Sequence, residues 1–554
     1  MLSRLRRRTA GPRPDPQGVN FTSEHLTAAK TLARRKQVIN AIWVRIPILS
    51  LWSGGALEDI ADNSLYFRFV LALVGIIWLL AIPYEGLWKR TYVDEHALQP
   101  SQVTMYFDWA EVHKADRYLD TLEKIVNGTF DERTAFLQES FSISGLATSN
   151  TSTSTYAHIR PPRSKGTETI LVSANWVSRD GTPNLRGIAT LLALGDFLQG
   201  QNHWASDLVL VVGEGYVEGL EGFMREYHNL FPGVIWTGLN IDYPGHSFSH
   251  LGMFYEGVNG RLPNQDIVNA ASNVARYAGG VLPRLHDVVD EPPAGFGSPL
   301  VQNYLLGAKH LLHHFAFMAT GRGSAAHGVL ARHRIDALTL YASPAEGPHG
   351  FHTLGRTIES TLRSMNNLLE RLHASYFFYL LPRPDQFIPV GHYLPAAVLL
   401  GASLTIGGFD CPSPLEGLGY ILPAFAVAAV AWIVGLHPIF LAPVPLAILP
   451  RPQGQAHTSA KSLTLLFYGA LIPTLAMVNF PQAVVLALIS LLYLTLPKYL
   501  ALAILAIQPG LILALAQGYW GLDLQKDWLA VGNLTWPGVY AVWLPLWMIS
   551  VVLL

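Results

Sequence analysis

Cysteine and charged side chains are scarce in this chain of 554 residues. Cys411 is the only cysteine, so the chain can form neither an intrachain disulfide nor a cysteine-based zinc site. Charged residues make up 14% of the sequence and hydrophobic residues 50%, a balance that indicates a membrane protein. The formal net charge is -1, so overall charge gives no argument for a nucleic acid partner, and none is expected.

The few charges are unevenly distributed, and the first 36 residues are strongly basic. Nine Arg or Lys residues lie there against Asp15 and Glu24. By itself such a segment is typical of a disordered basic tail. A membrane span follows it, however, and positive residues next to a span tend to stay in the cytosol. We therefore predict a basic cytosolic N-terminal region over residues 1–65, whose structure and role stay open.

Two parts of the chain consist of long apolar runs. The run FRFVLALVGIIWLLAI begins at Phe67, and we predict an uncleaved transmembrane anchor at residues 66–84. From Phe387 onward nearly the whole chain is apolar. We predict an α-helical multi-pass transmembrane bundle at residues 386–554, with candidate spans at about 387–407, 417–437, 462–478, 480–497, 499–516 and 533–554.

Residues 438–450 decide between six and seven spans in this bundle. The stretch is apolar but short for a span of about 20 residues. If it crosses as a broken helix, Arg451, Lys461 and Lys498 fall on the side of the basic N-terminus, as expected for cytosolic residues. This argument favours the larger number, which gives eight spans in the whole chain rather than seven.

Between the apolar parts, residues 85–385 resemble a soluble domain. Short apolar runs alternate there with helical patterns such as GIATLLALGDFL, and the runs lie at residues 169–175, 207–213, 234–242 and 335–342. This alternation predicts βαβ units and an α/β domain with a mainly parallel sheet. The Ser/Thr-rich stretch 149–156 is expected to be a solvated loop. A long amphipathic helix over residues 354–376 should close the domain, with Glu359 and Arg363 paired on its outer side.

The stretch VVGEGYVEGLEGF (211–223) resembles the glutamate turn of the two-zinc exopeptidases with an aminopeptidase-like fold. Asp242, in NIDYPG, and His327, in SAAHGVLARHRIDALTL, match two of the five metal ligands that this resemblance implies. The other three positions fail. Pro183 stands where the bridging Asp belongs, Val217 where the metal-binding Glu belongs, and LVSANWVS contains neither His nor Asp.

Two ligands of five cannot hold a pair of zinc ions, so we interpret the domain as an exopeptidase fold that has lost its metal site and predict no metal or other cofactor. Asp242 and His327 are then vestigial candidates. Glu214 is considered as a displaced base and His313 and His314 as substitute ligands, although adjacent histidines on a helix point in different directions and favour a surface role.

Four further stretches give a more specific resemblance. RTYVDEHAL (90–98), EGVNGRLPNQDIVN (256–269), HGVLARHRIDALTL (327–340) and NNLLERLHASYFFYLLP (366–382) resemble, in order and layout, the GPI-anchor attachment subunit of GPI transamidase. The resemblance covers residues 85–554. It implies a multi-pass protein of the endoplasmic reticulum membrane, with residues 85–385 forming a luminal domain.

The same resemblance implies function and partners. A caspase-like cysteine protease subunit of the complex cleaves the proprotein and forms a thioester, which the amine of the GPI glycolipid resolves. The present chain would be a noncatalytic subunit that presents GPI and supports assembly. Asn127 and Asn150 begin glycosylation sequons, which are usable only in a secretory lumen.

Candidate contacts to GPI lie at both ends of the chain. Tyr92, Asp94 and Glu95 follow the anchor, and their hydroxyl and carboxylate groups can bind a terminal ammonium, although a solvated stop after the anchor explains them as well. Pro545 bends the last span and can open a lipid slot between helices. Asn259 and Asn264 are expected to shape a turn that docks a neighbouring subunit.

Two other classes compete with the transamidase subunit. A membrane-tethered zinc-dependent aminopeptidase of the secretory pathway is disfavoured by Pro183 and Val217. A transporter would carry ionisable residues in the middle of its spans, and the segment 387–554 has almost none.

Overall fold

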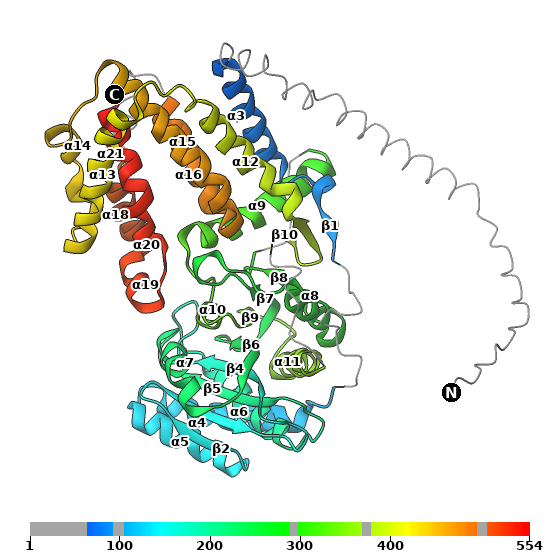
Figure 1. The fold of residues 1–554 in the computed structure, drawn as a ribbon. Helices are drawn as coiled ribbons and strands as arrows, with labels where there is room; N and C mark the ends of the chain where they lie inside the picture. Colours follow the sequence, from blue (N-terminus) through cyan, green and yellow to red (C-terminus); the bar gives the residue numbers. More distant parts are fainter. Residues whose placement is uncertain (1–63, 92–104, 289–296, 368–377, 496–506) are drawn as a thin grey trace, which may run out of the picture. The chain divides into compact units, whose positions relative to one another are not determined.

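The computed structural model describes residues 64–91, 105–288, 297–367, 378–495 and 507–554, and the predicted N-terminal region 1–65 lies almost wholly outside them. The described residues from Leu65 onward form one compact unit. It contains an α/β domain and a helical bundle (Figure 1).

The α/β domain is built on one eight-stranded sheet. Its strands lie in the order β2-β3-β5-β4-β6-β9-β7-β8. Their bounds are β2 Ala147–Asn150, β3 Ser154–Ile159, β4 Glu168–Asn175, β5 Asp207–Gly213, β6 Val234–Asp242, β7 Phe248–Phe254, β8 Leu282–Leu285 and β9 Asp336–Pro344. The central pairs β5-β4, β4-β6 and β6-β9 are parallel, as is β7-β8, whereas β2-β3, β3-β5 and β9-β7 are antiparallel. The predicted α/β domain with a mainly parallel sheet is confirmed.

Helices cover both faces of this sheet. They are α4 Trp109–Ile125, α5 Phe130–Ile143, α6 Leu185–Gln199, α7 Glu218–Leu230, α8 Gln265–Asn273, α9 Pro299–Thr320, α10 Gly328–Arg332 and α11 Phe351–Asn366. Successive strand residues face opposite sides, so Ile170 and Val172 pack with α4, α6 and α11, whereas Leu171 packs with α7 and α10. Burial on both sides explains why the central strands are continuous apolar runs.

Two predictions for this domain are wrong. The stretch 149–156 is not a solvated loop but contains the end of β2 and the start of β3, where Ser154 and Thr155 are buried. The Ser154 hydroxyl lies 2.7 Å from that of Thr151, and the Thr155 hydroxyl donates to that of Thr134 in α5 at 3.3 Å. A polar composition therefore concealed a buried strand.

The Glu359–Arg363 pair does not lie on the outside of α11. The two side chains form an ion pair of 2.7 Å and are 0% and 7% exposed. The Glu359 carboxylate accepts backbone hydrogen bonds from Tyr106 and Phe107 at 2.8–3.1 Å. The segment before α4 thus covers the polar side of α11, and the described helix ends at Asn366.

The helical bundle consists of α3 and the elements that follow the α/β domain. A small sheet, β1 (Lys89–Arg90), β11 (Gln386–Pro389) and β10 (Tyr379–Arg383), connects α3 Ser64–Ala81 to α12. The remaining bundle elements are α12 Val390–Ile406, α13 Pro414–Val434, η6 Pro438–Leu441, α14 Val444–Ala447, α15 Gly454–Val478, α16 Phe480–Thr495, α18 Pro509–Trp520, α19 Leu524–Val531, α20 Thr535–Gly538, η8 Val539–Trp543 and α21 Leu544–Val552.

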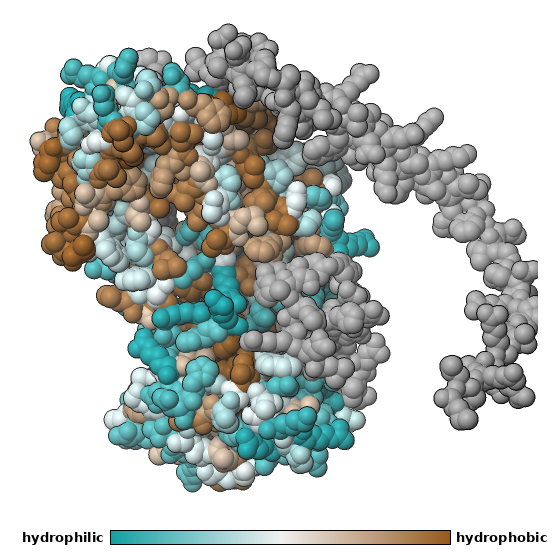
Figure 2. Space-filling view, viewed as in Figure 1, coloured by the Kyte–Doolittle hydropathy of each residue, from teal (hydrophilic) through white to brown (hydrophobic). Residues whose placement is uncertain are grey.

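Three helical stretches of the described residues are long and apolar enough to cross a membrane, namely Pro414–Val434, Gly454–Val478 and Thr535–Val552. Shorter apolar helices lie at Tyr66–Ala81, Val390–Ile406, Pro438–Ala447 and Phe480–Thr495. Hydrophobic residues dominate the surface of the bundle in Figure 2, and hydrophilic ones that of the α/β domain. Several predicted spans thus coincide with apolar helices, although the number of crossings stays a prediction.

Candidate functional site

Strands β4, β5 and β6 end side by side at Asn175, Gly213 and Asp242. We call this edge of the sheet the carboxyl edge. Loops after parallel strands converge at such an edge, which is where an α/β domain places its ligands. Asp242 ends β6 and Glu214 directly follows β5, so both carboxylates lie at this edge.

Asp242 is held by protein donors. Its carboxylate accepts from the Ser178 hydroxyl at 2.6 Å and from the Arg179 backbone N–H at 2.9 Å. The side chain is almost fully buried, and burial raises the pKa of Asp242 to about 6. The carboxylate is thus positioned by hydrogen bonds within the fold.

The position next to Pro183 is occupied by an amide that joins two strand ends. Asn184 donates to the carbonyls of Asn175 and Ile241 at 3.0 and 3.1 Å and accepts from the Tyr243 N–H at 2.7 Å. All polar atoms of this side chain are therefore used within the protein. The residues at this edge do not fit the bridging position of a two-zinc site, which requires an anionic oxygen.

Glu214 and Val217 lie on either side of the turn after β5. The Glu214 carboxylate pairs with Arg133 at 2.6 Å, and burial raises the pKa of Glu214 although the Arg133 charge opposes the shift. Val217 begins α7 as its N-cap residue and offers no ligand atom. The displaced Glu214 is thus engaged in an ion pair rather than aimed at a second ligand.

His327 is bonded within the protein as well. Its ring Nδ1 is 3.0 Å from the Thr339 hydroxyl, and Thr339 is paired with Asn240, two residues before the end of β6. Burial lowers the pKa of His327 to about 4, so the imidazole is neutral near pH 7. Among the described residues, no group of three or more possible metal ligands includes Asp242, Glu214 or His327.

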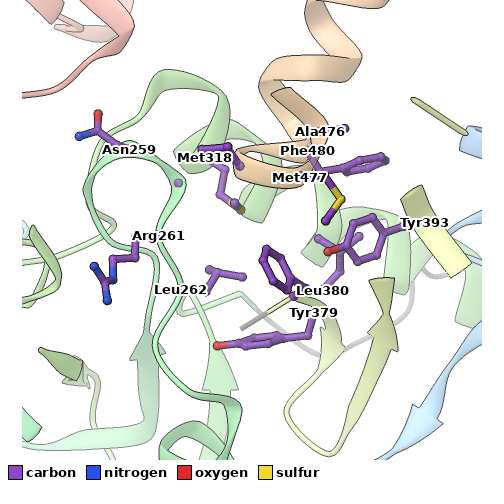
Figure 3. Close-up of a pocket in the computed structure, with 13 residues that line it drawn as sticks. Asn259, Arg261, Leu262, Met318, Tyr379, Leu380, Tyr393, Ala476, Met477 and Phe480 are labelled. Carbon is purple, nitrogen blue, oxygen red and sulfur yellow. The ribbon is translucent and has the colours of Figure 1, made fainter. Parts of the chain in front are cut away.

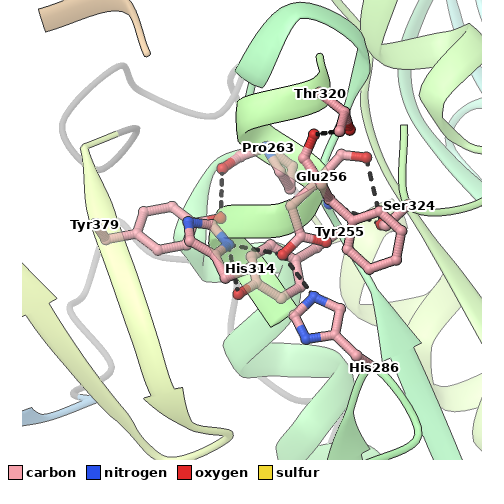
Figure 4. A network of polar contacts seen from close by, with 9 residues as sticks. Tyr255, Glu256, Pro263, His286, His314, Thr320, Ser324 and Tyr379 are labelled. Carbon is pink, nitrogen blue, oxygen red and sulfur yellow. Dashed lines mark hydrogen bonds and ion pairs between the residues drawn. The ribbon is translucent and has the colours of Figure 1, made fainter. Parts of the chain in front are cut away.

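A group of three possible metal ligands lies elsewhere among the described residues, and Figure 4 shows it. Glu256 follows β7, His286 follows β8, and His314 lies in α9. The Glu256 Oε1 atom is 2.5 Å from His286 Nε2 and 2.7 Å from His314 Nδ1. We call these three residues the Glu256 cluster.

The predicted surface role of His314 is wrong, whereas that of His313 agrees with its exposure. His314 is fully buried and stacks on the Tyr255 ring. Glu256 stands first in the quoted EGVNGRLPNQDIVN stretch, which is the sequence signal for this site. No motif in the sequence around His286 indicated that this residue belongs to the Glu256 cluster.

A second region of interest is the junction between the α/β domain and the bundle. The last carbonyls of a helix lack their usual partners; at the end of α9 the Gly321 N–H donates to Met318, and bundle side chains supply further donors. Asn479 donates to Met318 at 2.7 Å, Gln482 to Ala319 at 3.2 Å and Asn533 to Thr320 at 2.9 Å.

Arg322, just beyond α9, adds an ion pair with Asp527 at 2.7 Å. The four bundle partners come from the connection between α15 and α16, from α16, from α19 and from the turn before α20, so the end of α9 is fixed from several sides.

Asn259 belongs to the same junction. It has a φ of +63°, in the left-handed region that Asn tolerates. Its side chain donates to the Gly532 carbonyl at 3.2 Å and accepts from the Leu534 N–H at 2.6 Å. The predicted turn is confirmed, but Asn259 docks a loop of its own chain. Asn264 caps α8 by accepting from the Asp266 N–H.

A pocket of ≈ 380 Å³ opens beside this junction (Figure 3). It is lined mainly by apolar side chains from the turn after β7, β10 and the ends of α15 and α16, among them Leu262, Met318, Leu380, Met477 and Phe480.

Pro545 lies buried near the start of α21, directly after the π-helical turn η8. A wide turn before a proline accommodates its missing N–H. The Val542 carbonyl accepts from the Tyr468 hydroxyl of α15 at 2.8 Å, which ties this turn to a neighbouring helix. Tyr92, Asp94 and Glu95 lie outside the described residues. The sequon residues Asn127 and Asn150 are both exposed.

Comparison with known proteins gives sequence relatives and structural neighbours. The family profile described as "Gaa1-like, GPI transamidase component" matches residues 151–418. The chain is 29% identical over 393 residues to the GPI transamidase component GAA1 of Saccharomyces cerevisiae, covering 68% of this chain and 63% of that protein. It is 27% identical over 387 residues to gaa1 of Schizosaccharomyces pombe, covering 62% and 64%. The chain thus spans just under two thirds of these relatives.

Solved structures with similar α/β domains include Porphyromonas gingivalis glutaminyl cyclase, at 14% identity and a TM-score of 0.30, covering 45% of this chain and 98% of that one. Another is the Legionella pneumophila LapA aminopeptidase, at 10% identity and a TM-score of 0.33, covering 49% and 78%. The resemblance inferred from the sequence is confirmed by the sequence relatives: this chain is similar to the Gaa1-like GPI transamidase component.

Proposed function

We propose that this chain is a noncatalytic subunit of GPI transamidase in the endoplasmic reticulum membrane, where it presents GPI and supports assembly. The similarity to GAA1 over 393 residues carries this proposal. In it, residues 85–385 face the lumen, where Asn127 and Asn150 can be glycosylated. The partners are a caspase-like cysteine protease subunit, the other membrane subunits, the GPI glycolipid and the proprotein.

The carboxyl edge supports the noncatalytic part of the proposal. A two-zinc peptidase needs anionic and imidazole ligands around activated water, and here Asn184 and Val217 stand at or beside the missing positions. Asp242 and Glu214 are bound by Ser178, Arg179 and Arg133. The nucleophile of the transamidase would come from another chain, since Cys411, the only cysteine, lies between α12 and α13 of the bundle.

The junction supports a presenting role. Asn479, Gln482 and Asn533 bind consecutive carbonyls at the end of α9, which couples the α/β domain to helices that can span a membrane. A rigid connection of this kind holds a luminal domain at a defined height and orientation above lipid. Such positioning is what a subunit that brings a lipid substrate to another chain's active site requires.

For the lipid we propose a groove between α13, α15 and α21. It has a volume of ≈ 660 Å³ and is lined almost wholly by apolar side chains, including Leu418, Leu422, Phe425, Phe467 and Ile549. The GPI acyl chains are the occupant, because the groove offers hardly any polar atoms. Pro545 shapes the helix on one side, and Tyr468, which also lines the groove, holds that helix through Val542. Tyr92, Asp94 and Glu95 would meet the ethanolamine-phosphate head.

A tagged full-length chain, purified from membranes in mild detergent, tests this function. We expect the caspase-like subunit and further transamidase subunits to co-purify in constant ratio, together with GPI. The control is an equally tagged membrane protein of the same compartment. Recovery of the chain without any of these partners would overturn the proposal.

A further inference from the structure

We propose that the Glu256 cluster binds one divalent zinc ion, at a site distinct from the carboxyl edge. The inference is independent of the transamidase function, and it departs from the prediction that the chain holds no metal. Glu256, His286 and His314 offer one carboxylate oxygen and two imidazole nitrogens within 4.8 Å of one another. A carboxylate with two imidazoles is a ligand set that zinc prefers among common metal ions.

The cluster is buried, and one carboxylate oxygen in it is available to a further ligand. The three side chains are at most 1% exposed. Among the described residues, Glu256 Oε2, His286 Nδ1 and His314 Nε2 have no hydrogen-bond partner. A buried polar atom left without a partner costs about 1–3 kcal/mol. Zinc would bind the shared side of the cluster and, with a bidentate carboxylate, give Glu256 Oε2 a partner, whereas His286 Nδ1 and His314 Nε2 are the ring nitrogens on the opposite side.

The geometry requires only a small adjustment. Both imidazole nitrogens face the same oxygen, Glu256 Oε1, at 2.5 and 2.7 Å. Ligand atoms around a tetrahedral zinc ion lie about 3.3 Å apart, given zinc–ligand bonds of about 2.0–2.1 Å. Each imidazole nitrogen therefore has to move away from Glu256 Oε1 by less than about 1 Å, which side-chain rotation can provide. Water would supply a fourth ligand.

The backbone around the cluster is held firmly. Ser324 bonds both the backbone N–H and the carbonyl of Glu256. His286 adopts a φ of +53°, and its N–H donates to the Met253 carbonyl at 3.2 Å. His286 also lines a pocket with Arg179, Asp180 and Asp287, which gives an ion a route from solvent. Rigid ligands with an access route meet the requirements for a metal site.

The position of the site predicts what the ion does. Glu256 and His286 follow two strands at one side of the sheet, and His314 belongs to α9, the helix whose end is fixed by Asn479 and Asn533 of the bundle. An ion bound to all three would fasten α9 to the sheet close to the junction. We therefore assign the zinc a structural role.

Elemental analysis of the full-length chain, purified without chelators and then incubated with ZnCl₂ and desalted, tests the proposal. We expect close to one zinc per wild-type chain. Glu256→Gln, which keeps the shape of the side chain, and His314→Ala should each reduce zinc to near zero. His313→Ala, which removes the exposed neighbour on the same helix, should retain it. X-ray absorption of the wild type should show two imidazole nitrogens in the first shell.

Wild-type chain that stays well below one zinc after this incubation would overturn the proposal. So would zinc that persists undiminished in both Glu256→Gln and His314→Ala, since it would lie elsewhere. A variant that fails to fold is identified by its elution profile, and the isosteric Glu256→Gln then decides. The presence or absence of transamidase partners does not affect either result.

Discussion

The carboxyl edge and the Glu256 cluster contain the same kinds of side chains and satisfy them differently. At the edge, Asp242 accepts two protein donors, Glu214 pairs with Arg133, and the Asn184 amide is fully bonded. In the cluster, three side chains converge on one another and each retains an unpartnered atom. The residues that can bind a cation thus lie in the Glu256 cluster and not at the carboxyl edge, where an α/β domain usually places its ligands.

This difference teaches that likeness of fold and likeness of site must be argued separately. At the edge, the Gly-Leu-x-Gly turn and the parallel sheet resemble an exopeptidase, whereas Pro183 and Val217 offer no ligand atoms. The Glu256 cluster, in contrast, lies beside the junction with the bundle, where it can act on the position of α9.

The largest expected effect is a difference in local stability between the Glu256 cluster and the carboxyl edge. Glu256→Ala should reduce the free energy of local opening around β7 and α9 by about 3–5 kcal/mol, because it leaves buried imidazoles without their carboxylate. Glu214→Ala breaks a partly exposed pair and should cost about 1 kcal/mol or less at the edge. Hydrogen exchange of the purified chain, resolved by peptide, measures both. Equal effects of the two substitutions would contradict the comparison.

The next effect concerns pH, because Asp242 and His327 change folding stability with pH in opposite directions. The folded pKa of Asp242, about 6, lies above its ordinary value of about 3.9. The folded chain therefore binds more protons between these values, and Asp242 lowers stability as pH rises through them. The folded pKa of His327, about 4, lies below about 6.5, so His327 makes stability fall as pH drops from about 6.5 to 4.

Each contribution amounts to about 3 kcal/mol at most, since one pKa unit corresponds to about 1.4 kcal/mol. Asp242→Asn should steepen the increase in stability between pH 4 and 7, and His327→Gln should flatten it. Asn fits the Asp242 site because the Ser178 hydroxyl can accept its N–H. Unfolding midpoints of the two variants and the wild type across this range provide the measurement, and shifts of the same sign would refute the assignment.

Local patterns predicted the central part of the fold. The runs 169–175, 207–213, 234–242 and 335–342 all became strands of the sheet, because a strand buried on both faces must be continuously apolar. The hairpin of β2 and β3 was missed, since the buried hydroxyl groups of Ser154 and Thr155 are satisfied by hydrogen bonds to Thr151 and Thr134 that composition does not reveal. Glu359 was misplaced because only the covering segment at Tyr106 and Phe107 makes the polar side of α11 interior.

The candidate site was less predictable. The sequence showed that Pro183 and Val217 offer no metal-ligating atoms, and it placed Asp242 at the end of an apolar run. The Glu256 cluster could not be deduced, because Glu256 is 30 residues from His286 and 58 from His314. Only the packing of β8 beside β7, and of α9 nearby, brings them together.

A smaller effect is expected in the bundle, if the chain positions lipid rather than performing chemistry at the edge. Pro545→Ala should straighten the start of α21 and reduce GPI recovery with an intact complex about threefold, equivalent to less than about 1 kcal/mol. Tyr468→Phe, which removes the bond to Val542, should act in the same direction. Combining Pro545→Ala with Tyr92→Ala should reduce recovery further, because tail and head contacts are separate.

Pro395→Ala, in α12 and away from the groove, is the matched control and should leave recovery unchanged. Radiolabelled GPI co-purified with each complex is the readout. Undiminished GPI in Pro545→Ala would mean that the proline only fits the bundle, and loss of the partner subunits would assign it to assembly instead.

The noncatalytic role is tested most directly by removing the carboxylates of Glu214 and Asp242 from the carboxyl edge. Glu214→Gln and Asp242→Asn together abolish both acidic groups while keeping side-chain size and most hydrogen bonds. In cells whose own copy is deleted, GPI-anchored protein at the surface should match the wild-type level within about twofold, a difference of about 0.4 kcal/mol. A tenfold or greater loss with a fully assembled complex would contradict the account, because it would mean that the edge takes part in the reaction.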